Sequence, residues 1–142
     1  MNIKENFYSL FKTGFLIFIT LFIAIIGLPC LFLPRKYTAM LIHNWSKIML
    51  ILFKKLDNLD WEVTGEENIP SGPFIIASKH QSIWDTVFFT AFFNDAAMVL
   101  KKIIIFIPFY GWHAIKAKMI WLDRGAHSKA LRRLIKQGEE CS

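Results

Sequence analysis

The sequence predicts an α/β protein in which membrane-associated helices precede a domain of alternating strands and helices. No charged residue stands between Lys12 and Arg35. Apolar residues then recur at helical spacing through residues 38–56. Beyond them, short apolar strand patterns alternate with helical segments, as in α/β sheets. We therefore expect membrane-anchoring helices in residues 1–56 and a single domain in residues 57–142.

The uncharged segment is long enough to cross a hydrocarbon core, which takes about 20 helical residues. Pro29 is expected to kink this helix near its end. A shallow hairpin that enters one leaflet is the alternative, because the second apolar helix follows closely. That second helix carries Asn44 and Lys47 among its apolar positions, which favours an interfacial or membrane-packed helix.

Composition and charge agree with a membrane partner. Of the 142 residues, 54% are hydrophobic and 15% aromatic, and the mean hydropathy is positive. The net charge of +6 indicates an anionic partner, either nucleic acid or anionic lipid. Bases without acids follow the apolar run in residues 35–55, which favours lipid and a cytoplasmic domain. The later basic block, residues 116–136, is equally well explained as a solvated face, and no nucleic-acid-binding motif accompanies it.

The two cysteines predict neither a disulfide nor a metal site. Cys30 lies in the apolar run and Cys141 is next to the last residue, and no CxxC or Cys/His cluster accompanies them. A reduced domain that faces the cytosol is the expected setting.

The domain is expected to contain four strands and three helices. The strands are predicted at residues 60–64, 74–77, 97–100 and 119–122. The helices are predicted at residues 85–89, after a break at residues 108–111, and at residues 128–137.

A histidine and an aspartate five positions apart follow the predicted strand at residues 74–77. On one helix His80 and Asp85 would point about 140° apart. A loop-to-helix turn instead brings the carboxylate against the ring, where it fixes the tautomer while the ring takes a proton from a hydroxyl. The spacing alone occurs often by chance, but the strand-turn-helix setting is where α/β enzymes expose reactive groups. The other three histidines, His43, His113 and His127, are predicted to be structural or surface residues.

Several motifs in order resemble those of the glycerolipid acyltransferases. Lys79-His80-Gln81-Ser82-Ile83-Trp84-Asp85 resembles the first conserved block, Asn-His-x-Ser-x-x-x-Asp. Lys101-Lys102 and then residues 107–112 look like the segment that ends in Pro-x-x-Gly. Residues 120–124 look like the second block, and Asn68-Ile69-Pro70 fits the lead-in to the first. The resemblance covers about residues 61–137 and is greatest to the branch that acylates lysophosphatidate.

The resemblance implies a mixed-sheet domain that transfers an acyl group from acyl-CoA or acyl-carrier protein to the free hydroxyl of lysophosphatidate. It implies His80 as general base and Asp85 as the residue that orients it, with Ser82 ordering the turn. Arg124 would bind the acceptor phosphate through a bidentate contact, and Lys101 would add to the positive electrostatic potential. No metal or cofactor is implied beyond the acyl donor. Glycerol-3-phosphate and other lysolipids are alternative acceptors.

Three features depart from the family pattern. Lys79 stands where the family has asparagine, and Ile103-Ile104 replace an acidic residue and leucine. The third block, Phe-Pro-Glu-Gly-Thr, and the fourth are missing. We therefore expect a C-terminally truncated domain, and an inactive membrane protein is the alternative to an enzyme.

Overall fold

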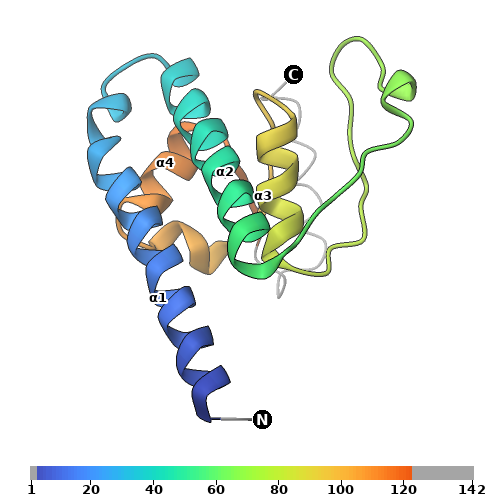
Figure 1. Ribbon diagram of the computed structural model, residues 1–142. Helices are drawn as coiled ribbons and strands as arrows, with labels where there is room; N and C mark the ends of the chain where they lie inside the picture. Colours follow the sequence, from blue (N-terminus) through green and yellow to red (C-terminus); the bar gives the residue numbers. More distant parts are fainter. Residues whose placement is uncertain (1–2, 123–142) are drawn as a thin grey trace.

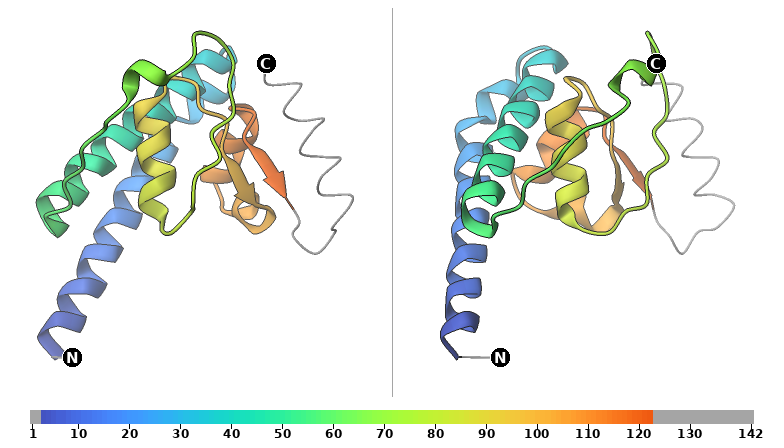
Figure 2. Two further views of the ribbon diagram at one scale, coloured as in Figure 1. Left: turned by 90° about the vertical axis from the view of Figure 1, so that its right-hand side faces the viewer. Right: turned by 45° about the vertical axis from the view of Figure 1, so that its right-hand side comes forward.

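A helical hairpin forms the first part of the molecule. The computed structural model describes residues 3–122, in which α1 (Ile3–Ile26) and α2 (Arg35–Asp57) run side by side, joined by the short 3-10 helix η1 (Leu28–Leu31) (Figure 1). The first turns of α1 project beyond all other elements in every view (Figures 1 and 2). Lys12 forms an ion pair with Asp57, which fastens the middle of α1 to the end of α2.

Local sequence explains where the hairpin turns. Gly27 follows the end of α1 and Pro29 stands in the first turn of η1, so the helix ends before Pro29 rather than being kinked by it as expected. A Cβ on Gly27 would lie 2.2 Å from Leu41 Cδ2, because α2 approaches the end of α1 closely there. Asn58 ends α2 in the left-handed conformation, φ 51°, and the helix predicted over residues 38–56 is confirmed.

The helix α3 (Ile83–Phe92) packs on α2 and builds the main apolar core. The core consists of Met49 and Leu50 of α2 with Val87 and Ala91 of α3. Two polar contacts join the same helices: the Ser46 and Thr90 hydroxyls lie 2.6 Å apart, and His43 Nδ1 lies 3.1 Å from the Thr90 carbonyl oxygen. The hairpin and the start of the predicted domain therefore share one core.

Two short parallel strands complete the described part of the chain. β1 (Val99–Lys101) pairs with β2 (Ile120–Leu122) in the register Val99↔Ile120 and Lys101↔Leu122. Between them the chain passes through the 3-10 helix η3 (Lys102–Phe106) and α4 (Tyr110–Lys116). The strands predicted at residues 97–100 and 119–122 and the helix after the break at residues 108–111 are confirmed.

The other two predicted strands are wrong. Between α2 and α3 the structure has one short 3-10 helix, η2 (Glu66–Asn68), and residues 60–64 and 74–77 are irregular. Alternating or apolar runs make a strand only where a neighbouring strand supplies hydrogen bonds, and among residues 3–122 these runs have none. Ile75 is accordingly 96% exposed. Within the described residues the sheet is parallel rather than mixed, and the helix predicted at residues 128–137 lies outside them.

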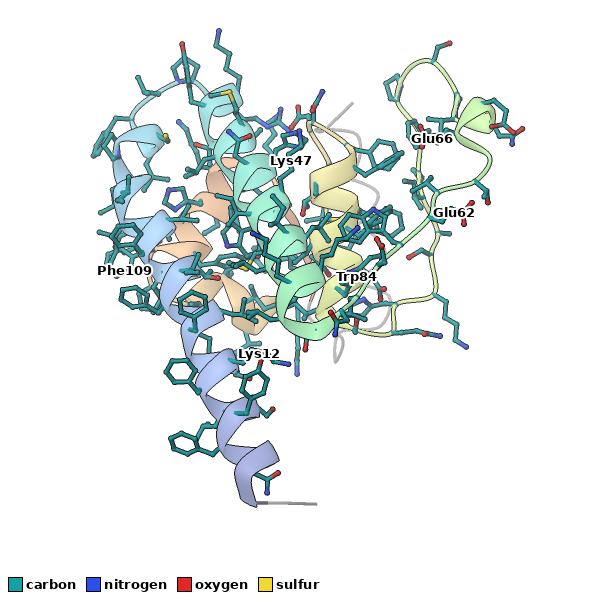
Figure 3. The ribbon with its side chains drawn as sticks, viewed as in Figure 1. Lys12, Lys47, Glu62, Glu66, Trp84 and Phe109 are labelled. Carbon is teal, nitrogen blue, oxygen red and sulfur yellow. The ribbon has the colours of Figure 1, made fainter. Side chains whose placement is uncertain are left out.

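The helix α1 presents a large apolar surface. Residues Asn6–Ile26 are long and apolar enough to cross a membrane, judged by length and composition. Little of this stretch is buried, and its outward side chains include Phe7, Leu10, Phe11 and Phe18. Side chains along the lower half of α1 stand clear of the other elements (Figure 3). This is the arrangement that a lipid-facing helix requires.

Candidate active site

The start of α3 holds the predicted pair in a capping box. Ser82 is extended and precedes the helix, and its Oγ accepts a hydrogen bond of 3.2 Å from the Trp84 N–H. In return the Asp85 carboxylate accepts a 2.9 Å bond from the Ser82 N–H. The Gln81 N–H donates a further bond of 2.6 Å to the same oxygen, Oδ2. The backbone of the turn therefore fixes the position of the carboxylate.

His80 lies against this fixed carboxylate. Its Nδ1 is 3.4 Å from Asp85 Oδ2, which is longer than an ordinary hydrogen bond but within ion-pair distance. The His80 side chain is 62% exposed and that of Asp85 is 21% exposed. The loop-to-helix turn expected from the sequence is confirmed, because His80 stands before the helix and Asp85 inside its first turn.

The electrostatics of the turn favour an ionised Asp85. The Ser82 N–H, then the Gln81 N–H, and to a smaller extent His80 hold the pKa of Asp85 below its ordinary value, against a small opposing effect of burial. Because an ionised carboxylate only accepts hydrogen bonds, it favours the His80 tautomer with the proton on Nδ1. Nε2 then carries the lone pair and faces away from the carboxylate, as a general base requires.

Aromatic rings pack against one another next to the turn. The Trp84 ring stacks on Phe88 with centroids 5.0 Å apart, and Trp61 lies 6.1 Å from Trp84. Trp61 belongs to the irregular segment before the site, so this contact ties that segment to α3. Among residues 3–122, the Trp84 indole N–H is buried without an acceptor. Sequence reasoning treated these tryptophans as core or interfacial residues and gave no reason to connect them with the turn.

The sheet brings Lys101 to the same end of the molecule. The start of α3 and the carboxyl ends of β1 and β2 lie at one end of the domain in both views of Figure 2. Lys101 is the last residue of β1, is exposed, and pairs in register with Leu122. Carboxyl ends of parallel strands are where open α/β sheets bind ligands. Arg124 lies outside the described residues, two positions after Leu122 along the chain.

Three of the five predicted site residues come together in the structure. Ser82 and Asp85 share the hydrogen bonds of one turn and His80 lies within ion-pair distance of Asp85, whereas no contact within residues 3–122 joins Lys101 to them. His43 and His113, predicted to be structural or surface residues, are both buried and contact backbone carbonyl oxygens. His127 lies outside the described residues. Among residues 3–122 no group of three or more metal-binding side chains occurs.

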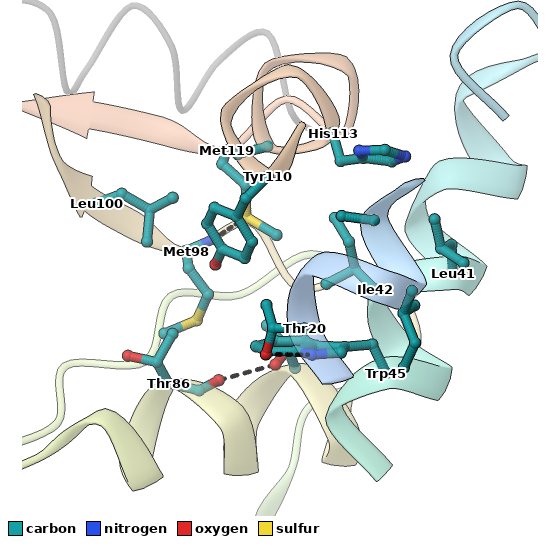
Figure 4. A pocket seen from close by; sticks show the side chains of 14 residues that line it. Thr20, Leu41, Ile42, Trp45, Thr86, Met98, Leu100, Tyr110, His113 and Met119 are labelled. Carbon is teal, nitrogen blue, oxygen red and sulfur yellow. Dashed lines mark hydrogen bonds between the residues drawn. The ribbon is translucent and has the colours of Figure 1, made fainter. Parts of the chain in front are cut away.

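An apolar cavity of about 40 Å³ lies between the helices and β1 (Figure 4). The Trp45 indole N–H donates a 3.3 Å bond to Thr20 Oγ1 on its wall, and burial raises the pKa of the Tyr110 phenol. A single water needs about 10–15 Å³ of such space. The cavity therefore holds at most a few water-sized groups, and as it stands it is a gap in the packing rather than a substrate site.

Known proteins match the chain over the segment that contains this turn. The family model described as Acyltransferase matches residues 60–140, more than half of the chain. The 1-acyl-sn-glycerol-3-phosphate acyltransferase of Pseudomonas aeruginosa is 41% identical over 100 residues, which cover 70% of this chain and 39% of that protein. The enzyme of the same name from Saccharomyces cerevisiae is 31% identical over 105 residues, covering 73% and 32%.

The chain thus spans about two fifths of the length of the first relative and about one third of the second. No solved structure matches it. Both relatives carry the name of the branch that the motifs indicated, so the resemblance found in the sequence is confirmed. The chain belongs to the acyltransferase family.

Proposed function

We propose that the protein is a membrane-bound O-acyltransferase that esterifies the free hydroxyl of 1-acyl-sn-glycerol-3-phosphate, giving phosphatidate. The observation that carries the proposal is the His80–Asp85 pair, held by a capping box at the exposed start of α3. The names of the two relatives support the choice of acceptor. The acyl donor is a thioester, acyl-CoA or acyl-carrier protein.

The proposed reaction uses His80 twice. Its Nε2 removes the proton as the acceptor oxygen attacks the thioester carbonyl, and Asp85 stabilises the charged ring that results. The C–S bond then breaks, and the imidazolium returns the proton to the departing thiolate. The products are an ester and a free thiol. These steps require no metal and no cofactor beyond the donor itself.

Positive charge at the carboxyl ends of the strands would hold the acceptor phosphate. Lys101 stands at the carboxyl end of β1, at the same end of the domain as the start of α3 (Figure 2). Arg124 follows β2 closely in the sequence, and its guanidinium suits a forked contact with a phosphate. Ser82 serves this site by capping α3 rather than by touching substrate.

The acceptor is a lipid, so we propose that α1 holds the protein at a bilayer. Its exposed apolar side chains support this, and basic residues after the apolar run favour a domain on the cytoplasmic side. Vesicle flotation tests the assignment. Replacing both Phe11 and Phe18 by lysine should abolish flotation, whereas Ile75→Lys, at an even more exposed apolar site away from α1, should not. Unchanged flotation of the double variant contradicts the proposed role of α1.

The enzymatic proposal is tested with the purified chain in detergent or vesicles. The measurement is transfer of a labelled acyl group from acyl-CoA or acyl-carrier protein to lysophosphatidate. His80→Ala should lower the rate about 10²- to 10⁴-fold, the usual contribution of a general base. Gln81→Ala is the matched control, because Gln81 contacts Asp85 through its backbone N–H, which this change retains.

The same assay decides between an enzyme and an inactive membrane protein. Parallel runs with glycerol-3-phosphate and other lysolipids identify the acceptor. A folded chain that transfers nothing to any acceptor, while the Pseudomonas aeruginosa relative is active in the same vesicles, supports the inactive alternative. Equal activity of wild type and His80→Ala rules out the proposed mechanism.

A further inference from the structure

Large apolar side chains are exposed along the segment that joins β1 to β2. Ile103 and Phe106 of η3 are 66% and 69% exposed, and Trp112 and Ile115 of α4 are 50% and 53% exposed. The opposite face of α4 is buried, so the outward pair does not contribute to the core. We call these four side chains the η3–α4 surface. Exposed apolar surface of this kind marks a site for a partner or for a membrane.

The helix α4 lies beside the end of α1. The two helices are in contact, and the His113 ring of α4 reaches the Gly27 carbonyl oxygen, which directly follows α1, at 3.1 Å. Phe109 lies next to α1 on the side away from α2 (Figure 3), and its ring centroid is 5.3 Å from that of Trp112. Trp112 therefore continues the exposed apolar side of α1.

The two stretches that form this side of the molecule carry basic residues and no acid. Neither residues 6–56 nor residues 96–122 contain an aspartate or a glutamate. Asp95, which precedes the second stretch, is paired with Arg35. Lys116 directly follows Ile115, and Lys36 lies 5.2 Å from the centroid of the Tyr37 ring at the start of α2. Apolar side chains that are bordered by basic ones suit the surface of an anionic bilayer.

The residue types on the surface also favour lipid headgroups over a protein partner. Tryptophan is enriched at the boundary between a membrane and water, where the apolar ring and the polar N–H are both satisfied. A lysine such as Lys116 lays its apolar stem on the hydrocarbon and keeps its charge among the headgroups. Ile103 stands where the related family pattern has an acidic residue. This chain thus exposes an apolar side chain at a position where a negative charge would oppose contact with anionic lipid.

We propose that the η3–α4 surface is a second lipid-binding surface, which contacts the bilayer beside α1. The inference rests on the proposed role of α1 in membrane binding and is independent of acyl transfer. Because η3 begins directly after Lys101 and α4 lies beside α1, the surface connects the proposed active site with the hairpin. The bilayer would then meet the domain next to the carboxyl end of β1, where the lipid acceptor is bound in the proposed reaction.

Tryptophan fluorescence reads this contact directly. The chain has five tryptophans, all within residues 3–122, and Trp112 is the exposed one, whereas the other four are partly buried. The full chain is mixed with vesicles of phosphatidylcholine and phosphatidylglycerol whose acyl chains are brominated, because bromine quenches an indole that touches it. We expect the wild type to be quenched. Trp112→Phe, which retains an apolar ring, should lose most of the quenching, and Trp61→Phe should retain it.

Vesicle partition provides a second measurement. Ile115→Lys should raise the lipid concentration required for half-maximal binding about three- to tenfold, the factor expected when half of such an apolar side chain no longer leaves water. Val99→Lys is the matched control, because Val99 is 51% exposed and β1 lies away from α1 in both views of Figure 2. Ile103→Glu should weaken binding to vesicles that contain phosphatidylglycerol more than binding to pure phosphatidylcholine.

The outcomes separate this proposal from the role of α1. A chain that floats with vesicles but shows no quenching, or whose quenching survives Trp112→Phe, overturns the second surface and leaves the role of α1 intact. A chain that does not bind vesicles contradicts both. Self-association in detergent that Trp112→Phe or Ile115→Lys abolishes, together with an absence of quenching by lipid, would instead assign the surface to a second copy of the chain.

Discussion

Replacing Ser82 by alanine should weaken α3 while leaving the His80–Asp85 contact in place. The hydroxyl accepts one hydrogen bond from the first turn of α3, at 3.2 Å from the Trp84 nitrogen. Loss of such an N-cap typically costs about 1 kcal/mol, within a range of roughly 0.5–2 kcal/mol. The bonds from the Gln81 and Ser82 N–H groups to Asp85 are backbone bonds and survive the substitution.

The size of the effect on activity follows from the same energy. If the whole of about 1 kcal/mol were lost from the transition state, the rate would fall roughly fivefold, because about 1.4 kcal/mol corresponds to tenfold. The thermal midpoint should fall by about 2–8 °C for a chain of this size. His80→Ala should do the opposite, lowering the rate by orders of magnitude with little change in stability, since the ring is largely exposed.

Thermal unfolding and acyl transfer, measured on the same preparations, test this reasoning. Ser82→Asp and Ser82→Thr retain a capping oxygen and should behave like wild type in stability. A Ser82→Ala protein with unchanged stability and no activity would refute the capping role and assign the hydroxyl to the chemistry.

Two further predictions concern the same fold. The Ser82 and Gln81 N–H groups lower the pKa of Asp85 in the folded chain, so the stability that they contribute is present above the ordinary pKa of 3.8 and is lost as the pH falls through the lowered value. Asp85→Asn should remove this loss of stability in acid from urea unfolding curves measured at several pH values. A variant that loses as much stability in acid as the wild type would contradict the prediction. Gly111→Ala would place a Cβ 2.0 Å from the Ile105 carbonyl oxygen and should destabilise the chain by about 1–3 kcal/mol or more. The control is Gly14→Ala inside α1, where a Cβ meets nothing within 4 Å and stability should be equal or higher. Thermal midpoints of the two variants measure the difference.

The helices were predictable because their signals are local. The uncharged apolar run, the period of residues 38–56 and the prolines that flank the hairpin turn specify α1 and α2 without reference to distant residues. The motif around His80 likewise predicted a turn, since its spacing suits no single helix face. The helix was predicted at residues 85–89, whereas α3 begins at Ile83, because Ser82 caps its first turn.

The strands show where local signals fail. Residues 74–77 and 97–100 are both short apolar runs, yet in the described chain only the second pairs, as β1 with β2. Pairing depends on a partner many residues away, and the pattern within one run carries no information about it. The same limit applies to His113, whose neighbour Gly27 is 86 positions distant in sequence.

The sequence by itself indicated the family, two consecutive apolar helices and a turn that carries His80 and Asp85, because motif order, apolar periodicity and residue spacing are properties of neighbouring residues. The tertiary structure alone decided that one Asp85 oxygen faces two backbone N–H groups and His80, and that the hairpin shares a core with α3. It also decided that a buried imidazole joins α4 to the end of α1. These are distances between side chains and backbone groups, and they exist only after the chain has packed.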